Sequence, residues 1–421
     1  MSRRPVPTRK ASWRDKLGPG LVTGAADDDP GGIGTYTQVG AQFGYGLGWA
    51  MILSYPLLAA IQLVCARIGT VTGRGIAANL KLRYPIAVLW FAVTLLLVAN
   101  VVNIGADLGA MAAALDLVLP GSIGLYTMAF AVVSVGLEVF LSYAKYASVL
   151  KWATLSLLAY LMVPFAAGLD WGAVLAGLTN PGLTFDKAAA MAVVALLGTT
   201  ISPYLFFWQT GQEVEELHRT HQAALKDDPD HARAIWRGIR AETLSGMALT
   251  LLTALAIVVS AAATLHLHGT TQITSTAQAA AALRPIAGDL AFFLFATGLV
   301  GTGLLAVPVL AGSAAYAVSE AFGWREGLDC KPREAKAFYG VIALATLAGL
   351  AINLMAIDPM TALYWSAVLN GLLAPPLMAL TLLLGRDRSI MGGMAISPSL
   401  QGLGWLATAM MTIAGAAFLL S

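Results

Sequence analysis

Long apolar segments alternate with short polar segments along the whole chain. The length of each apolar segment is close to the roughly 20 residues that an α-helix needs to cross a bilayer. We count eleven such segments, at 18–43, 47–68, 85–110, 121–141, 148–168, 187–210, 241–265, 287–318, 336–357, 360–384 and 401–420. The pattern predicts an all-α polytopic membrane protein with eleven transmembrane helices, and the lipid bilayer as its surroundings.

The composition leaves little room for a soluble domain. Hydrophobic residues make up 58% of the chain and charged residues 11%, against about 25% charged residues in a typical soluble domain. No Gly-rich phosphate loop is present. We therefore expect neither an enzyme nor a nucleic-acid-binding protein, and we expect no resident cofactor and no obligate protein partner.

The basic residues are concentrated in alternate connecting segments. Of the 25 Lys and Arg residues, 23 lie in segments that share one side of the membrane if all eleven spans form, and only Lys187 and Arg284 lie on the other side. Because cytoplasmic loops carry an excess of Lys and Arg, this distribution predicts a cytoplasmic N-terminus and an external C-terminus. A bacterial-type cytoplasmic membrane is the expected location.

Two of the predicted spans are interrupted by helix-breaking residues. The first contains Asp-Pro-Gly-Gly at 29–32, and the sixth contains Gly-Thr-Thr-Ile-Ser-Pro at 198–203. Five spans separate their starts, so 17–170 and 186–384 are predicted to be two five-helix repeats of opposite orientation. Paired interruptions of this kind indicate the substrate site of an inverted-repeat transporter. Two unrelated proline kinks are the alternative.

The rest of the chain is predicted to connect or flank these repeats. The longest polar stretch, 211–240, is interpreted as a cytoplasmic linker with some helix. Its histidines are irregularly spaced, which argues against a metal site there. The other segments are a cytoplasmic tail at 1–16, an outer loop at 171–185, and an inner loop with a peripheral eleventh helix at 385–421.

The two breaks supply oxygen atoms that suit a metal cation. In the first break, the carbonyls of Ala26 and Gly32 become available, and Asp29 is biased away from helical geometry because it precedes a proline. In the sixth, the Thr199 carbonyl and the Ser202 hydroxyl are the corresponding groups. One carboxylate with several neutral oxygens suits a hard divalent cation such as Mg²⁺ or Mn²⁺. Adjacent carboxylates would repel an anionic organic solute.

Two further acidic residues have open roles. Asp28 is either a vestibule charge that attracts cations or a residue that faces water or caps the backbone. Asp107 shares a helix face with Asn100 and Asn103, and an ionisable residue within a span is a functional hypothesis by default. Asp107 also lies about 33 Å along an ideal helix from Pro85. We therefore favour a position at the outer interface.

Three motifs lie in and after the first break: Gly-Pro-Gly-Leu-Val-Thr-Gly-Ala-Ala-Asp-Asp-Asp-Pro-Gly-Gly at 18–32, Gln-Phe-Gly-Tyr at 42–45 and Arg-Ile-Gly-Thr-Val-Thr-Gly-Arg at 67–74. In these motifs the sequence resembles the NRAMP family of divalent-metal transporters. The similarity is close over the first two spans and extends to the eleven-span layout. The resemblance implies a LeuT-type fold of five plus five helices with broken helices 1 and 6. It also implies that Asp29 is the acidic ligand and that carbonyls near Ala26 and Thr199 contribute.

Two departures from the family pattern concern the choice of metal. The family motif Asp-Pro-Gly-Asn ends in Gly32 here, and the methionine of Met-Pro-His is replaced by Ser202. A thioether favours softer transition metals, whereas hydroxyl groups and water favour Mg²⁺. Smaller side chains also leave room for Mg²⁺ to keep several waters.

Other departures concern proton coupling and gating. The family histidine becomes Tyr204, a second histidine becomes Gln209, and the acidic pair of the third span reads Asn103 and Ala106. Asn370 matches a polar family residue of the tenth span. The pattern is similar to the NRAMP-related magnesium transporters, in which proton coupling is thought to be lost. We therefore expect a secondary transporter of Mg²⁺ and/or Mn²⁺ that works by alternating access with weak or no proton coupling. The alternatives are a proton-coupled Mn²⁺/Fe²⁺ symporter and an amino-acid or organic-solute transporter of the same fold.

Overall fold

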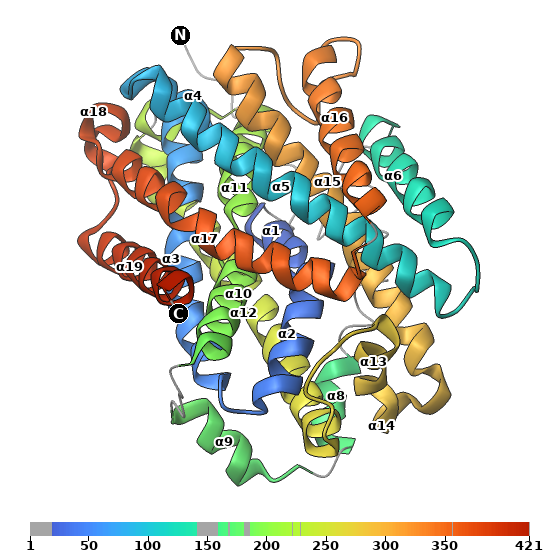
Figure 1. Ribbon diagram of the computed structural model, residues 1–421. Helices are drawn as coiled ribbons and strands as arrows, with labels where there is room; N and C mark the ends of the chain where they lie inside the picture. Colours follow the sequence, from blue (N-terminus) through green and yellow to red (C-terminus); the bar gives the residue numbers. More distant parts are fainter. Residues whose placement is uncertain are drawn as a thin grey trace.

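The computed structural model is all-helical within the residues that it describes (Figure 1). These residues are 19–140, 159–166, 169–180, 186–220, 222–227, 229–355 and 357–420. The predicted tail at 1–16 lies outside them, as does most of the predicted fifth span at 148–168. The predicted all-α class is confirmed.

The helices divide into broken, long and short ones. The two broken spans are α1 (Pro19–Asp27) with α2 (Pro30–Phe43), and α10 (Lys187–Thr200) with α11 (Pro203–Arg219). The long helices are α3 (Gly48–Thr72), α5 (Ile86–Asp116), α6 (Ile123–Phe140), α12 (Pro229–Thr264), α15 (Ala291–Phe322), α16 (Lys336–Ile352), α17 (Pro359–Arg386) and α19 (Pro398–Leu420). The short ones are α4 (Ile76–Arg83), α8 (Ala159–Ala166), α9 (Trp171–Thr179), α13 (Thr276–Ala280), α14 (Arg284–Ala287) and α18 (Arg388–Met391).

Nine helical segments within the described ranges are long and apolar enough to cross a membrane. The first broken span is not among them, whereas the other broken span, Lys187–Arg219, is counted as one segment. The multispan membrane class is thus confirmed, whereas the count of eleven helices, the two repeats and the orientation of the termini stay predictions.

The broken spans lie in the middle of the helix bundle. The half-helix α1 packs along α12, and α10 packs along α17 (Figure 1). Glycine makes both contacts close: a Cβ added at Gly24 would collide with the backbone of Gly246, and one added at Gly198 would collide with that of Gly371. Small residues let membrane helices approach at backbone distance. The halves that end at the breaks are therefore held by close backbone packing.

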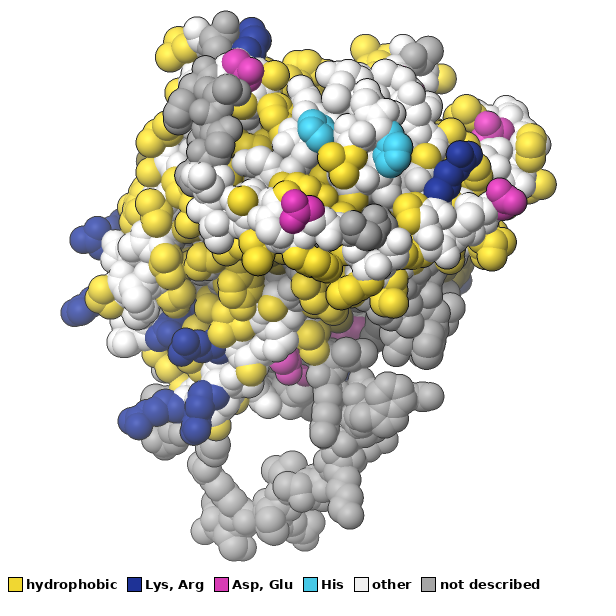
Figure 2. Space-filling model, turned by 90° about the horizontal axis from the view of Figure 1, so that it is seen from below, with side chains coloured by type: hydrophobic (Ala, Val, Ile, Leu, Met, Phe, Trp, Pro, Cys, Tyr) yellow, Lys and Arg dark blue, Asp and Glu magenta, His cyan; other side chains and the backbone are white. Residues whose placement is uncertain are grey.

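Apolar side chains face outward on the peripheral helices. Val132 on α6, Leu344 on α16 and Ile413 on α19 are each between 67% and 68% exposed. Figure 2 shows hydrophobic side chains spread over much of the surface in view. A surface this apolar is expected where lipid is the solvent.

Two predicted connections contain more helix than expected. Within 211–240, α11 continues to Arg219 and α12 begins at Pro229. The polar composition was misleading because some of its charged residues face inward: Glu213 is only 2% exposed. Within 171–185, α9 forms behind an Asp170 cap that accepts from the Gly172 and Ala173 amides.

Candidate functional site

The first break is organised by Asp29. This residue has extended backbone angles (φ −76°, ψ 169°) and caps the N-terminus of α2. Its Oδ1 accepts a hydrogen bond of 2.6 Å from the Gly32 amide. Pro30 at the first helical position starts α2 without losing an amide that the helix would use. The carboxylate is therefore held in the gap between α1 and α2, and its residue is only 3% exposed.

The sixth break is organised by Ser202, but in another way. Ser202 also precedes a helix that begins with proline, yet its side chain makes no cap hydrogen bond. Its hydroxyl instead lies 2.8 Å from the Thr199 carbonyl oxygen and 3.0 Å from that of Gly198. The predicted ligand groups of Thr199 and Ser202 are thus adjacent, with the hydroxyl turned toward the end of α10.

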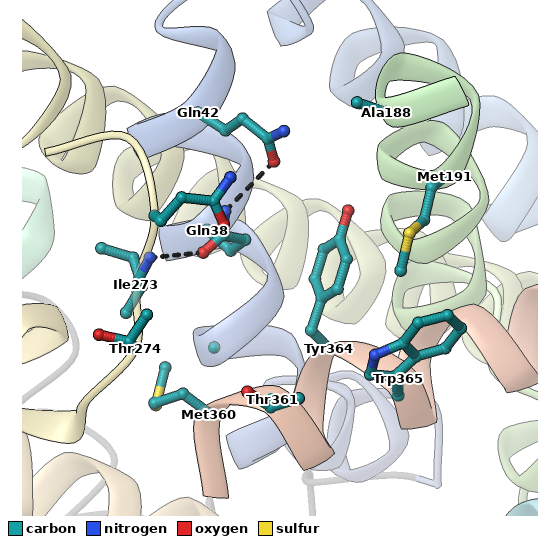
Figure 3. Close-up of a pocket in the computed structure, with 12 residues that line it drawn as sticks. Gln38, Gln42, Ala188, Met191, Ile273, Thr274, Met360, Thr361, Tyr364 and Trp365 are labelled. Atoms are coloured by element: carbon teal, nitrogen blue, oxygen red, sulfur yellow. Dashed lines mark hydrogen bonds between the residues drawn. The ribbon is translucent and has the colours of Figure 1, made fainter. Parts of the chain in front are cut away.

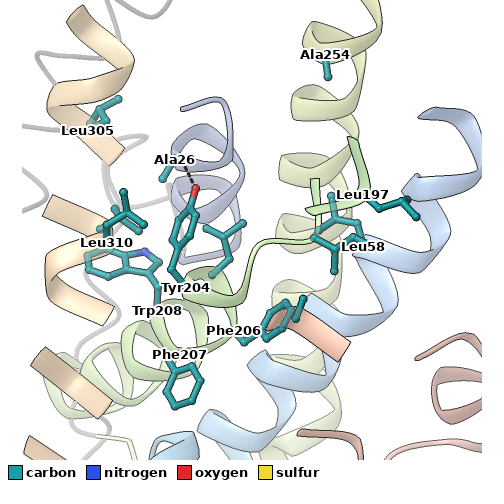
Figure 4. Packing of buried hydrophobic residues seen from close by; sticks show 14 of the residues in the cluster. Ala26, Leu58, Leu197, Tyr204, Phe206, Phe207, Trp208, Ala254, Leu305 and Leu310 are labelled. Carbon is teal, nitrogen blue, oxygen red and sulfur yellow. Dashed lines mark hydrogen bonds between the residues drawn. The ribbon is translucent and has the colours of Figure 1, made fainter. Parts of the chain in front are cut away.

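Tyr204 connects the two breaks. Its hydroxyl lies 3.2 Å from the carbonyl oxygen of Ala26 and 3.2 Å from Oδ2 of Asp29, and it donates to them. Figure 4 shows this side chain reaching from α11 to Ala26 on α1. Three of the predicted site residues therefore converge on one point, where oxygen atoms from both sides of the first break lie close to one hydroxyl.

Gly32 contributes its amide, which donates to Asp29. Because Gly32 lies inside α2, its carbonyl accepts a hydrogen bond within that helix and is not available to a metal ion. The prediction of a free Gly32 carbonyl is wrong for this reason. A Cβ at Gly32 would lie 3.2 Å from Tyr36, 3.3 Å from Asp29 and 3.5 Å from Thr199. The missing side chain therefore leaves little extra room.

The structure places Asp107 near Asp29, and its predicted place at the outer interface is wrong. The residue is 1% exposed, and its carboxylate interacts with the Gly31 amide and electrostatically with Asp29. The physical reason is the path of α5, which is 31 residues long and crosses the bundle obliquely (Figure 1). The shared face with Asn100 and Asn103 was the signal that could have revealed this position.

Asn103 and Asn100, which share the Asp107 face of α5, contact other helices. Asn103 donates from Nδ2 to Oδ1 of Asn370 over 3.0 Å, which joins α5 to α17. Asn100 donates to the Leu310 carbonyl and to the Ser313 hydroxyl of α15. The structure therefore brings Asn103 and Asn370 together as a pair, while Asp107 turns to the first break.

Asp28 and Gln209 lie beside the break residues. The Asp28 carboxylate interacts with the Thr253 side chain of α12, whose hydroxyl donates to the Leu249 carbonyl of its own helix. Gln209 is fully buried on α11 and donates from Nε2 to Glu213, one turn further along, over 2.8 Å. Asp27 is also fully buried, and within the described residues neither of its carboxylate oxygens has a hydrogen-bond partner.

A pocket of about 280 Å³ lies near the far half of α2. It is bordered by α2, α10, α17 and the segment 272–274 (Figure 3). Gln38 ties this segment to α2, because its Oε1 accepts 2.8 Å from the Ile273 amide. Gln42 and Thr361 add polar groups to the lining.

The chemistry of the site is that of oxygen ligands. In the part of the chain that the structure describes, no three His, Cys, Asp or Glu side chains are arranged to hold a metal ion by themselves. A cation at the break would depend on the Asp29 carboxylate together with carbonyl and hydroxyl oxygens. Such a mixed set suits a hard divalent ion that passes through.

Comparison with known proteins gives consistent results. A family model described as natural resistance-associated macrophage protein-like (Nramp) matches residues 20–421. The divalent metal cation transporter MntH of Chromohalobacter salexigens is 27% identical over 307 residues, which are 70% of this chain and 68% of that protein. MntH of Yersinia pestis is 27% identical over 317 residues, covering 72% and 71%.

Solved structures show the same fold. A manganese transporter of Eremococcus coleocola superposes with a TM-score of 0.73 at 18% identity, over 97% of this chain and 87% of that one. Mhp1, a nucleobase-cation-symport-1 family transporter, superposes with a TM-score of 0.61 at 17% identity, over 96% and 90%. The structural neighbours are thus Nramp and LeuT-fold transporters.

The family match bears on several predictions from the sequence. Nramp proteins are membrane transporters and not enzymes, and they carry the metal as substrate and not as a cofactor. Both predictions are confirmed, as is the resemblance to the Nramp family, whereas the resemblance to its magnesium-transporter branch stays a prediction. With its model matched from residue 20 to residue 421, this chain belongs to the Nramp family.

Proposed function

We propose that this chain is a secondary transporter that carries Mg²⁺ and/or Mn²⁺ across the membrane by alternating access, with weak or no proton coupling. The observation that carries the proposal is the convergence at the first break, where Tyr204 joins the Ala26 carbonyl to the Asp29 carboxylate. The names of the relatives, divalent metal cation transporters and a manganese transporter, support the substrate class.

The ligands that we propose are oxygen atoms from both broken spans. Asp29 supplies the charge and Ala26 a carbonyl, and both are already within hydrogen-bonding distance of one hydroxyl. Ser202 and Thr199 complete the set once the Ser202 hydroxyl turns from the Thr199 carbonyl. A bound cation would then take the place of the Tyr204 hydroxyl as the partner of the Ala26 carbonyl and the Asp29 carboxylate.

The type of oxygen favours a hard cation. The position after the sixth break holds a hydroxyl and no thioether, so no soft ligand is offered at Ser202. Mg²⁺ is usually bound by one or two carboxylates while keeping several waters. Mn²⁺ accepts the same oxygen ligands, and for this reason both ions remain in the proposal.

The proposal of weak proton coupling rests on side chains that do not titrate near neutral pH. Tyr204, Gln209 and Asn103 occupy the positions at which the family resemblance implies histidines and a carboxylate. Asn103 is paired with Asn370 in a neutral hydrogen bond. A proton would have to travel by another route.

The test is uptake of Mg²⁺ and Mn²⁺ into proteoliposomes that contain an internal pH dye. We expect both ions to enter without acidification, and we expect Asp29→Ala to abolish entry. Ser54→Ala in α3 is a suitable control, because that buried hydroxyl donates only to its own helix at Met51. Mn²⁺ entry with acidification would replace the proposal by a proton-coupled symporter. If wild-type protein carries neither ion, transport of an amino acid or other organic solute becomes the hypothesis to test.

A further inference from the structure

We propose that Asp107 is a second acidic ligand of the cation site, one that contacts the hydrated cation opposite Asp29 and sets its preference for divalent over monovalent ions. This inference rests on the proposed function, since it assigns a role in the same site. It concerns a residue of α5, a helix that belongs to neither broken span.

Two consecutive amides of α2 interact with the two carboxylates. The Gly32 amide donates to Oδ1 of Asp29 over 2.6 Å, and the Gly31 amide interacts with the carboxylate of Asp107. Both amides belong to the first turn of α2, where backbone donors are free and the helix dipole favours negative charge. One helix end thus positions carboxylates that come from separate parts of the chain.

Asp107 retains an oxygen that can bind a ligand. The residue is 1% exposed, and within the described ranges its Oδ2 has no hydrogen-bond partner. The Tyr204 hydroxyl, which marks the point of convergence at the break, interacts electrostatically with both Asp29 and Asp107. The carboxylate of Asp107, which includes this unpaired oxygen, therefore acts on the same hydroxyl as Asp29.

Glycine at 31 makes this arrangement possible. A Cβ at Gly31 would lie 3.2 Å from Oδ1 of Asp29, which is tighter than an ordinary contact. Without a side chain there, the Asp29 carboxylate can fold over the first turn of α2.

The charge of the pair matches that of a divalent ion. Two buried carboxylates repel each other strongly when the site is empty, and one Mg²⁺ or Mn²⁺ neutralises both. A monovalent ion would leave one negative charge uncompensated in a low-dielectric site. Binding by two carboxylates with retained waters is also the usual arrangement for Mg²⁺ in proteins.

The experiment compares Asp107→Asn with Asp107→Ala in the full-length protein, with Mn²⁺ and Mg²⁺ as the probes. Asn keeps an oxygen for the Gly31 amide but removes the charge, whereas Ala removes both. We expect both variants to weaken the apparent affinity for each ion by at least about tenfold and to make uptake sensitive to Na⁺. Glu138→Gln is the matched control, because Glu138 is a buried carboxylate on α6, a helix that packs against α5 and α16.

The outcomes separate this inference from the proposed function. If Asp107→Asn transports like wild type while Asp107→Ala does not, Asp107 only caps α2 and the inference is overturned. Wild-type behaviour of both variants overturns it as well. If the wild-type protein neither binds nor carries Mn²⁺ or Mg²⁺, the proposed function fails, and this inference fails with it. Should neither variant fold, Asp107→Glu against Asp107→Gln provides the same comparison of charge, and equal affinities would contradict the inference.

Discussion

The two broken spans have the same construction but different chemistry. Each half-helix ends, an extended residue follows, and a proline starts the next helix, at Pro30 in one span and Pro203 in the other. In the first, the residue before the proline is Asp29, whose carboxylate binds an amide of the following helix. In the second it is Ser202, whose hydroxyl binds carbonyls of the preceding helix. The first break is charged and the second is neutral.

A transport site must both attract a cation and discriminate between cations, and the two breaks differ in which of these they suit. A carboxylate provides the long-range attraction that draws a cation from water, and its effect depends little on which divalent ion arrives. A neutral ligand contributes less energy but discriminates by its softness. We infer that the first break determines whether a cation binds, and that the second determines which cation binds best.

Both broken spans contact a neighbouring helix through a glycine at backbone distance. Substituting these glycines is the prediction with the largest expected effect. Gly24→Val and Gly198→Val each place a side chain inside the backbone of a neighbouring helix, at Gly246 and Gly371. We expect each to lower the free energy of unfolding by about 3 kcal/mol or to prevent folding. Thermal unfolding in detergent measures this. Gly340→Val on α16 is the control, because a Cβ there would meet open space.

A large loss of stability in only one of the two variants would contradict the equivalent packing of the two broken spans. If Gly198→Val unfolds the protein while Gly24→Val is tolerated, α1 can move away from α12 at little cost, and the packing of the two spans is not equivalent. Equal tolerance of all three variants would mean that the close contacts contribute little to stability.

The second prediction concerns the contact between the spans. Tyr204→Phe removes the donor that competes with a cation for the Asp29 carboxylate and the Ala26 carbonyl. A hydrogen bond to a charged group has a net value of about 1.5 to 3 kcal/mol, and water replaces part of it. We expect the apparent affinity for Mn²⁺ and Mg²⁺ to rise by about threefold to tenfold. A lower affinity would show that Tyr204 orients Asp29 for binding and does not compete with the cation.

Much of this comparison could be predicted from the sequence, because helix breaks are local events. The pairs Asp29-Pro30 and Ser202-Pro203 restrict their own backbone whatever surrounds them, and both occur where α-helices end and begin. The convergence of Ala26 and Asp29 follows from the same local geometry. These features need no knowledge of how the helices pack.

The position of Asp107 and the direction of the Ser202 hydroxyl could not be predicted in this way. Measuring along α5 placed Asp107 near an interface, but the oblique path of that helix brings it to Gly31. A hydroxyl rotates to the best acceptor nearby, and for Ser202 that acceptor is the carbonyl of Thr199. Both depend on tertiary packing, which hydropathy and motif spacing do not contain.

The third prediction tests whether the sixth break selects the ion. Ser202→Met introduces a thioether beside the site, so we expect uptake of Cd²⁺ and Mn²⁺ to increase relative to Mg²⁺ by about tenfold. Ser202 is fully buried, and a larger side chain will cost about 1 to 3 kcal/mol of stability. Ser202→Leu is the matched control, since it adds similar bulk without sulfur. A change in selectivity that both variants share would come from bulk and would contradict the proposed role.

The smallest expected effect comes from Ser202→Ala, and its sign is decisive. The hydroxyl now lies 2.8 Å from the Thr199 carbonyl oxygen. If that hydroxyl turns to the cation, as we propose, its removal weakens the apparent affinity for Mg²⁺ by about threefold, in line with a net value near 1 kcal/mol for a neutral hydrogen-bonding group. If the hydroxyl only shields the carbonyl, its removal exposes Thr199 and strengthens affinity. Ser202→Thr keeps the hydroxyl and is expected to stay closer to wild type. A rise in affinity with Ala would therefore mean that the neutral break contributes through its backbone and not through the Ser202 side chain.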